Sequence, residues 1–326
     1  MISRRHILQA GAALAVPILS PLARAQRVDS AKVLFGFAPG GANDIVSRAI
    51  AAKMGSYAKS VVVENRTGAG GQLACAALKT APADGSVLLC SPFSCTAIYP
   101  HVYKKLPYDA LTDFATVSTA ASFTLGLAAG PGVPSTVRSV PDYLQWVRED
   151  VKARGGYGHP AAGSASHFVG ALLGLDAKID MVPVPYRGST PGIVDAMAGQ
   201  VPVMLTGTGD LLPFVKSGKL RVLATSGPAR DVFLPEVPTF KEQGFPNIVA
   251  EETVGFYAPA KTPRDIIDAA NRAIAEALQS PDVISQLAGI GLAVRASTPE
   301  SMSATLKSEH RRWAVLVKRI GFTAES

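Results

Sequence analysis

The sequence predicts an α/β fold of two lobes, each a mostly parallel sheet flanked by helices, with two hinge crossings between the lobes. One observation is that short β-like runs alternate with helical runs along most of the chain. Strands separated by helices form parallel sheets, because the chain must cross over before the next strand begins. The other is that these units fall into two groups, joined by extended pieces near residues 120–130 and 249–258. Two crossings of this kind are typical of proteins that close like a clamshell.

Lobe 1 is expected to comprise residues 26–125 and 254–326. Apolar runs rich in Val, Leu and Phe predict its strands, and apolar residues at three- and four-residue spacing predict its helices. After residue 260 the pattern is mainly helical. The predicted strands are AKVLFGF (31–37), SVVVEN (60–65), SVLLCSP (86–92) and TVGFYAP (253–259), and the predicted helices are 44–54, 72–79, 263–279, 281–290 and 299–322.

Lobe 2 is expected to comprise residues 126–253, where the same alternation continues. Each short strand is followed by a helix of modest length, as in a βα unit. The predicted strands are TLGLAAG (124–130), GYGHPA (156–161), MVPVPY (181–186), VPVMLTGT (201–208) and LRVLATS (220–226), and the predicted helices are 140–153, 166–173, 191–198 and 211–216.

The chain opens with an export signal. A start carrying Arg4 and Arg5 precedes an apolar stretch from Ile7 to Leu22, and Ala23-Arg24-Ala25 follows as a cleavage site of the A-x-A type. This pattern predicts a signal peptide over residues 1–25, cleaved after Ala25. The paired arginines fit a twin-arginine signal, and an ordinary secretory signal also tolerates them, so the export route stays open.

The composition limits the classes of molecule that the protein is expected to bind. The signal holds three of the 32 basic residues and none of the 25 acidic ones, so the mature chain has a net charge of about +4. No Lys/Arg run with interleaved aromatics appears, which argues against a nucleic-acid partner. Cys75, Cys90 and Cys95 are odd in number and form no C-x-x-C pair. Either all three are buried thiols, or Cys90 and Cys95 form a disulfide.

The first informative joint between strand and helix is FGFAPGGANDIVSRAIAAKM, residues 35–54. Pro39, Gly40 and Gly41 let a ligand approach the main chain, and the first amides of the following helix, from Ala42 onward, lack acceptors within it. An anion suits such a helix start. Alternatively, Asn43 or Asp44 caps the helix. The spacing matches neither G-x-G-x-x-G nor G-x-x-x-x-G-K-[ST], so a dinucleotide or nucleoside triphosphate is a poor candidate.

A second joint lies at Gly163-Ser164-Ala165-Ser166-His167. Here small residues and two hydroxyls coincide with the free amides of a helix start, and a carboxylate would accept charge-assisted bonds from both. The alternative is that Ser164 or Ser166 only caps the helix. His167 either lines a cleft or makes a core contact.

Two further joints add charged candidates. Arg187, in Tyr186-Arg187-Gly188, either meets an anion or is a solvated surface residue. Asp210, after Thr206 and Gly207, either receives a ligand ammonium or caps the helix from Leu211. Residues after Leu89, including Ser91 and Ser94, are expected to form the floor of the site.

The sequence offers no catalytic or metal constellation. Ser166 and His167 are neighbours on a helix and point about a quarter-turn apart, which is unsuited to a nucleophile and its base. Gly188-Ser189-Thr190-Pro191-Gly192 lacks the serine at the centre of a nucleophile elbow. The histidines have no metal-binding spacing, and no cofactor motif appears. We therefore expect no enzyme activity, no metal and no cofactor.

Over nearly all of its mature length the chain resembles the tripartite tricarboxylate transporter substrate-binding receptors, also called Bug receptors. The matching pieces are spread along the chain in order: APGGANDIVSR, VVVENRTGAGG, APADGSVLL, YKKLPYDALTDFA, GSASHFVG, VPYRGSTPGIVDAMAGQV, GKLRVLATSGPARDVFLPEVPTFKEQGFP, GFYAPAKTP and a final EHRRW. The resemblance implies a periplasmic receptor of the type II binding-protein kind, which closes on a small carboxylated ligand.

The resemblance also implies how the joints are used. In the family the Pro-Gly-Gly loop helps to hold one carboxylate, and the helix start that matches residues 163–166 helps to hold the other end of the ligand. Two departures bear on ligand choice: Asn43 stands where the family often has Ser or Thr, and Arg187 where it usually has Lys. The expected ligand contacts are Pro39, Gly40, Gly41, Ala42, Asn43, Asp44, Ser91, Ser94, Gly163, Ser164, Ala165, Ser166, His167, Arg187, Thr206, Gly207 and Asp210.

The expected function is that of a monomeric solute receptor for a small organic mono- or dicarboxylate, amino acids included. It presents the ligand to the membrane subunits of a tripartite transporter. Two alternatives remain from the sequence. One is a secreted serine hydrolase that uses Ser164 or Ser166 with His167. The other is a receptor that presents its ligand to a sensor protein.

Overall fold

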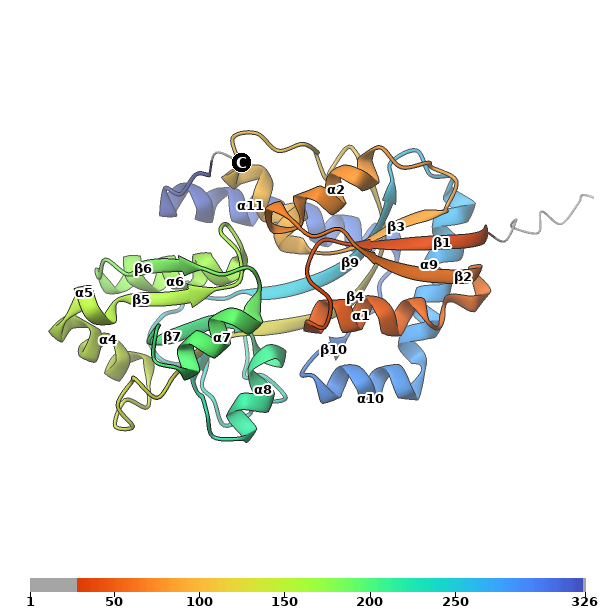
Figure 1. Cartoon of the computed structure of the whole chain (residues 1–326). Helices are drawn as coiled ribbons and strands as arrows, with labels where there is room; N and C mark the ends of the chain where they lie inside the picture. The colour runs from red at the N-terminus through yellow and green to blue at the C-terminus, as the bar shows by residue number, and fades with distance from the viewer. Residues whose placement is uncertain (1–27, 325–326) are drawn as a thin grey trace, which may run out of the picture.

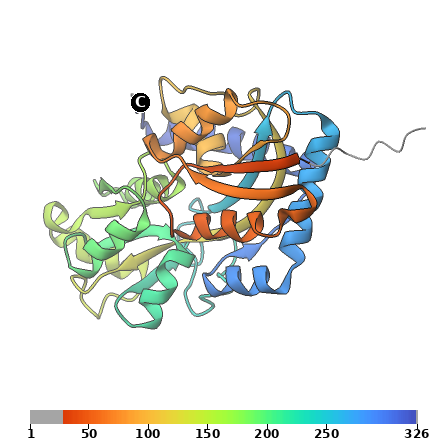
Figure 2. The same ribbon diagram turned by 45° about the vertical axis from the view of Figure 1, so that its right-hand side comes forward.

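A computed structural model describes residues 28–324 of the chain. The predicted signal peptide, residues 1–25, and its cleavage site lie outside this range and stay predictions. Figures 1 and 2 show two lobes side by side. The two ends of the described chain are in one lobe, and the middle of the chain, coloured green, forms the other. The α/β fold of two lobes is therefore confirmed.

Lobe 1 is built around β1 (Val28–Phe35), which pairs in parallel with β2 (Ala58–Asn65) and with β3 (Val87–Pro92). The crossovers contain α1 (Ala42–Ala51) and α2 (Gln72–Lys79). The alternation of strands and helices thus produces the parallel pairs that it predicts. The other elements of this lobe are η1 (Met54–Ser56), η2 (Ala69–Gly71), η3 (Ser94–Ile98), α3 (Tyr99–Val102), α9 (Arg264–Gln279), α10 (Pro281–Gly289), β10 (Ala293–Val294) and α11 (Pro299–Ile320).

Lobe 2 repeats this arrangement around β5 (Gly156–His159), which pairs in parallel with β6 (Val182–Pro185) and with β7 (Val203–Gly207). The crossovers are α6 (Ala165–Ala177) and α7 (Ser189–Met197), both visible in green in Figure 1. The remaining elements are α4 (Val140–Glu149), α5 (Val151–Arg154), α8 (Thr208–Lys216) and β8 (Arg221–Thr225).

The two crossings are strands, as the extended pieces near residues 120–130 and 249–258 predict, but the first is longer than expected. β4 (Phe114–Ala129) is far longer than the strand predicted at 124–130. Up to Thr124 it pairs with β9 (Glu251–Pro259), and from Leu125 it pairs with β7. All of these pairings, and that of β9 with β3, are antiparallel, because the chain leaves lobe 1 along β4 and returns along β9. The lobe boundaries near residues 125 and 254 remain a proposal.

The helix predicted over 140–153 is interrupted at Asp150. Its backbone leaves the helical region with φ −156° and ψ 80°, and its carboxylate accepts a 3.1 Å hydrogen bond from the Ala153 amide. Asp150 therefore ends α4 and caps α5, as expected from the preference of Asp for N-cap positions.

The three cysteines are free and buried. Cys90 packs with Val33 and Phe35 in one core cluster, whereas Cys75 and Cys95 pack with Leu34 in another. The disulfide alternative for Cys90 and Cys95 is therefore wrong for this structure, and the reading as buried thiols is correct.

Candidate ligand-binding cleft

A cavity of about 400 Å³ lies between the lobes. Lobe 1 contributes the loop before α1 and the start of η3, and lobe 2 contributes the starts of α6, α7 and α8. Phe123 and Leu125 of β4 and Glu252 of β9 complete the wall at the crossings. Helix N-termini of both lobes thus meet at one cavity, and their first amides lack acceptors within the helices.

At the start of α1 the N-cap is Gly41, which has no side chain to bond the free amides. Asp44 instead stabilises the loop that precedes α1. Its carboxylate accepts hydrogen bonds from the Gly40 amide (2.9 Å), Arg48 Nε (2.9 Å) and Asn65 Nδ2 (2.8 Å). Neither Asn43 nor Asp44 caps the helix, so the sequence alternative of a cap at these positions is wrong. The amides are left open to the cleft.

The charge of Asp44 is well compensated although its side chain is only 2% exposed. Burial opposes ionisation, but the bonds from Arg48, Asn65 and the Gly40 amide hold the pKa of Asp44 below its usual value. Gly40 has a φ of +90°, a conformation that glycine adopts without the strain of a Cβ. The loop therefore adopts this conformation without backbone strain and with the Asp44 carboxylate hydrogen-bonded beneath it.

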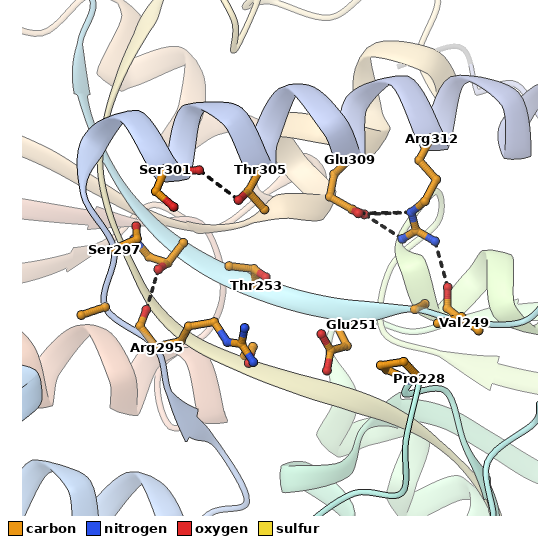
Figure 3. Close-up of a pocket in the computed structure, with 14 residues that line it drawn as sticks. Pro228, Val249, Glu251, Thr253, Arg295, Ser297, Ser301, Thr305, Glu309 and Arg312 are labelled. Carbon is orange, nitrogen blue, oxygen red and sulfur yellow. Dashed lines mark hydrogen bonds and ion pairs between the residues drawn. The ribbon is translucent and has the colours of Figure 1, made fainter.

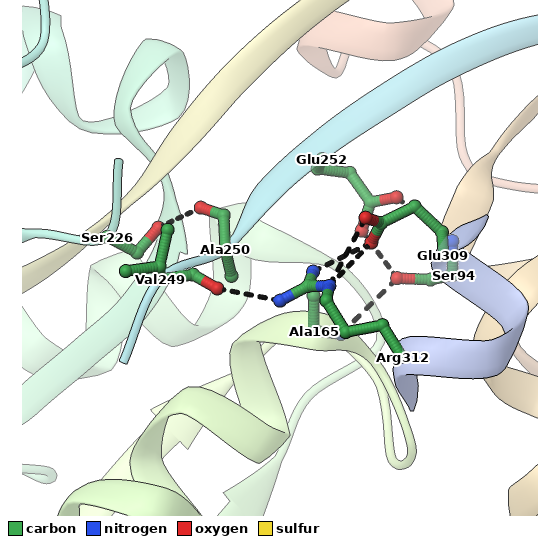
Figure 4. Close-up of polar contacts among 8 residues, drawn as sticks. All are labelled: Ser94, Ala165, Ser226, Val249, Ala250, Glu252, Glu309 and Arg312. Carbon is green, nitrogen blue, oxygen red and sulfur yellow. Dashed lines mark hydrogen bonds and ion pairs between the residues drawn. The ribbon is translucent and has the colours of Figure 1, made fainter. Parts of the chain in front are cut away.

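At the start of α6, Ser164 is the N-cap, and its Oγ accepts a 3.3 Å hydrogen bond from the His167 amide. The capping alternative therefore holds for Ser164. The next amide, that of Ala165, donates across the cleft to Ser94 Oγ of lobe 1 at 3.3 Å. This bond links the two lobes (Figure 4).

Ser94 is in turn bonded to Glu252 on the return crossing. Its amide donates to Glu252 Oε1 at 2.9 Å, and its hydroxyl donates to Oε2. Burial raises the pKa of Glu252 to about 7, against the lowering effect of the Ser94 bonds. The like charge of Glu309 on α11 contributes to this rise. The cleft thus has a buried acid at its α6 end.

At the α1 end Asp210 approaches from lobe 2. Thr206 Oγ1 donates to Asp210 Oδ2 at 3.3 Å, and Ser189 Oγ lies 2.7 Å from Thr206 Oγ1. The Ala42 amide, on the facing lobe, also favours the charged form of this carboxylate. Burial raises the pKa of Asp210, and these bonds lower it in part. α8 starts at Thr208 and its N-cap is Gly207, so Asp210 does not cap that helix as the alternative reading supposed.

His167 lies in the core and outside the lining of the cleft. The residue is 3% exposed. Its ring stacks on that of His159, with 4.6 Å between ring centroids, and packs in a T-shaped arrangement against Phe322, with 4.5 Å between centroids. Nδ1 accepts a 3.1 Å bond from the Gly163 amide. Burial lowers the pKa of His167 to about 3, so the ring is neutral. The expectation that His167 contacts ligand is not supported, because helix geometry turns it towards α11 and the C-terminal segment.

The predicted ligand contacts divide into residues that line the cavity and residues that do not. Arg187 lines it although its side chain is exposed. Those that line the cavity are Pro39, Gly41, Ala42, Asn43, Asp44, Ser94, Ser164, Ser166, Arg187, Thr206, Gly207 and Asp210. Those that do not are Gly40, Ser91, Gly163, Ala165 and His167. Gly40, Gly163 and Ala165 shape the two helix starts, and Ser91 is buried on β3 with its hydroxyl bonded to the Pro92 carbonyl.

Sequence reasoning missed the residues that complete the wall. Glu252 is preceded by Glu251 at the start of an apolar strand, where acids are usually solvated. The aromatic residues Phe37, Tyr99 and Phe123 look like ordinary core positions in the sequence. These three side chains line the same cavity because of the way β4 passes between the lobes.

A second cavity, of about 560 Å³, lies on the other side of the crossing strands (Figure 3). Glu251 and Thr253 line it while Glu252 lines the first, because successive side chains of a strand point to opposite faces. Its other wall is α11, where Arg312 bonds Glu309 at 2.7 Å and the Val249 carbonyl at 2.8 Å. This arrangement ties α11 to the return crossing.

Across residues 28–324, no group of three or more His, Cys, Asp or Glu side chains is placed to hold a metal ion. Within the same range no helix has both the length and the apolar character needed to cross a membrane.

Comparison with known proteins decides the family. Residues 46–322 match the model of the tripartite tricarboxylate transporter family receptor. The chain belongs to this family. The receptor is 32% identical over 320 residues to Protein BugT of Bordetella pertussis, covering 97% of this chain and 95% of that protein. It is also 32% identical to a protein of the tcbD-tcbE intergenic region of Pseudomonas sp. strain P51, covering 97% and 94%.

Solved structures agree with the two-lobed fold of the receptor. The periplasmic binding protein BugD aligns with a TM-score of 0.82 at 26% identity, over 90% of this chain and 98% of that one. An R. palustris protein with adipate, Rpa4515, aligns with a TM-score of 0.84 at 28% identity, over 90% and 98%. MatC from Rhodopseudomonas palustris with bound malate aligns with a TM-score of 0.80 at 28% identity, over 89% and 99%.

Proposed function

We propose that this receptor works as a monomer in the periplasm, where it captures a small carboxylate between its lobes and presents it to the membrane subunits of a tripartite transporter. One observation carries the proposal: the starts of α1 and α6, one from each lobe, face a single cavity. Free amides at a helix start favour anions. That two structural neighbours hold adipate and malate supports a carboxylate in particular.

We assign the predicted contact residues to two roles in this proposal. The residues that line the cavity bind the ligand. Gly40, Gly163 and Ala165 keep the two helix starts in shape. His167 and Ser91 are left out, because both are engaged within lobe cores.

Ligand release tests the proposal. The mature protein is purified without added ligand, unfolded gently, and the released small molecules are identified by mass spectrometry. Each is then titrated back by calorimetry. The expected result is a small carboxylate that binds one per chain and loses affinity when the α1 loop is altered. If no carboxylate is released and none binds, the proposed function is wrong.

The hydrolase alternative is disfavoured by geometry. A serine nucleophile needs the imidazole as its base, yet His167 Nδ1 is bonded to the Gly163 amide and not to Ser164 or Ser166. A panel of esters and amides should show no turnover that is lost in Ser164→Ala or Ser166→Ala.

A further inference from the structure

The charged side chains of the cleft are unevenly balanced, and this bears on the ligand that the proposed function assigns to it. Asp44 is neutralised by Arg48. Arg187 is exposed. The two remaining acids, Asp210 and Glu252, have no ion-pair partner within residues 28–324, and both line the cavity. The acidic side chains that line the cleft therefore outnumber the basic ones, although the ligand proposed above is itself a carboxylate.

Two acceptors line the α1 end of the cavity. The Asp210 carboxylate accepts a hydrogen bond from Thr206, and the Ala42 amide of the facing lobe favours its charged form. On the next residue, Asn43, the side-chain oxygen is buried and has no hydrogen-bond partner among the described residues. A ligand carboxylate that binds the following amides of α1 meets the Asp210 carboxylate beside it. An ammonium adjacent to that carboxylate removes the conflict, because its three N–H groups donate to acceptors of this kind.

At the α6 end Glu252 discourages a second anion. Both of its oxygens accept hydrogen bonds from Ser94, so the Ser94 hydroxyl hydrogen is already engaged by Glu252 and is not free to donate to a ligand carboxylate. Glu309 adds a like charge close to Glu252, and the cation drawn in Figure 4, Arg312, is held by Glu309 and the Val249 carbonyl. A neutral group or a hydrogen-bond donor suits this end better than a carboxylate does.

We propose that the ligand is an amino acid with an uncharged side chain, that Asp210 and the Asn43 side-chain oxygen receive its ammonium, and that Glu252 selects against a second carboxylate. The ligand carboxylate lies at the start of α1. The ligand side chain passes between Phe37 and Phe123 towards Ser94 and Glu252. Dicarboxylates of the kind held by the structural neighbours are accordingly poor ligands of this chain.

The first test compares ligands on the wild-type mature protein, freed of bound ligand. The twenty standard amino acids and the dicarboxylates succinate, malate, glutarate and adipate are titrated at pH 8. The tightest amino acid is then compared with its deaminated analogue. An amino acid with an uncharged side chain is expected to bind at least tenfold more tightly than any dicarboxylate, and loss of its amine is expected to weaken binding at least tenfold.

The second test uses matched variants. Asp210→Asn should reduce the preference for the amine over its deaminated analogue to threefold or less. Asp180→Asn makes the same charge change at an exposed position of lobe 2 outside the cavity, and should leave the preference unchanged. Glu252→Gln should improve the binding of dicarboxylates relative to the parent. If a variant does not fold, the comparison of ligands on the wild-type protein still tests the inference.

Three results would overturn the inference: a dicarboxylate as the tightest ligand, a deaminated analogue that binds as well as the amino acid, or an amine preference that survives in Asp210→Asn. In the first two cases a carboxylate still binds, so the proposed function stands while this inference fails. If no carboxylate of any class binds, both fail.

Discussion

Replacing Gly41 with Asp should separate the stability of the protein from its affinity for ligand. Gly41 has φ −75° and ψ 164°, the extended conformation of a normal N-cap, and a Cβ built on it meets no atom within 4 Å. An aspartate therefore fits without strain. Its carboxylate accepts bonds from the first amides of α1, as N-cap aspartates do. These are the amides that we propose bind the ligand.

The two effects differ in size. A side-chain cap in place of glycine adds a few tenths of a kcal/mol, and a negative charge at a helix start adds about 0.3–1 kcal/mol, which repulsion from Asp210 reduces. The free energy of unfolding should therefore change by less than about 1 kcal/mol. Loss of one charge-assisted amide bond to the ligand costs about 1.5–3 kcal/mol, or roughly 10- to 150-fold in Kd.

Calorimetry with the released ligand and thermal unfolding without it measure the two quantities on the same preparations. Gly41→Asn supplies the cap without the charge, and Gly41→Ala adds only a methyl group. Affinity should fall most for Asp, less for Asn and least for Ala. A Gly41→Asp protein that unfolds normally and binds within threefold of the parent would remove the α1 amides from the site and refute the reasoning.

Three further predictions follow from the structure. Because the pKa of Glu252 rises from 4.5 to about 7 on folding, this group contributes up to about 3 kcal/mol of stability that is lost as pH rises across this window. The buried His159 and His167, whose pKa values are lowered, act in the opposite direction, so the Glu252 contribution is measured as the difference between the parent and Glu252→Gln in urea unfolding at pH 4.5 and 7.5: the variant should gain stability relative to the parent as pH rises. Ser164→Ala removes the α6 cap and should lower stability by about 1 kcal/mol, a Tm decrease of about 2–4 °C by calorimetry, whereas Ser166→Ala, which makes no cap bond, should not. Ligand should reduce the radius of gyration in small-angle scattering, since only the closed form contacts it with both lobes; an unchanged radius together with a free form that is already closed would contradict the clamshell mechanism.

The local pattern of the sequence was enough to predict the α/β class and the two helix starts that face the cleft. Strand and helix periodicity, the glycines before α1 and the small residues before α6 act over a few residues each, so they are visible without the fold. The family resemblance drew on the same local pieces, and the family match confirms it. The signal peptide stays a prediction from the sequence.

Tertiary structure alone decided which side chains share the cleft. The sequence left Asp44 either as a helix cap or as a ligand contact, and in the structure it supports its loop through Arg48 and through Asn65 at the end of β2. The sequence left His167 either in the cleft or in the core, and in the structure it faces His159 and Phe322 in the core. Each outcome depends on contacts between residues distant in sequence, which no local pattern encodes.

The acids of the cleft are the clearest case. In the sequence Asp210 follows a glycine-rich turn and Glu252 begins a strand, and both positions usually face water. The fold places Asp210 against an amide of the opposite lobe and Glu252 beneath Ser94. Whether a carboxylate is solvated or buried depends on the chain that packs over it, and here that chain belongs to the other lobe or to the crossing strands. The sequence by itself determined where two helix starts would leave amides free, and the packing of two lobes decided which charges would lie beside them.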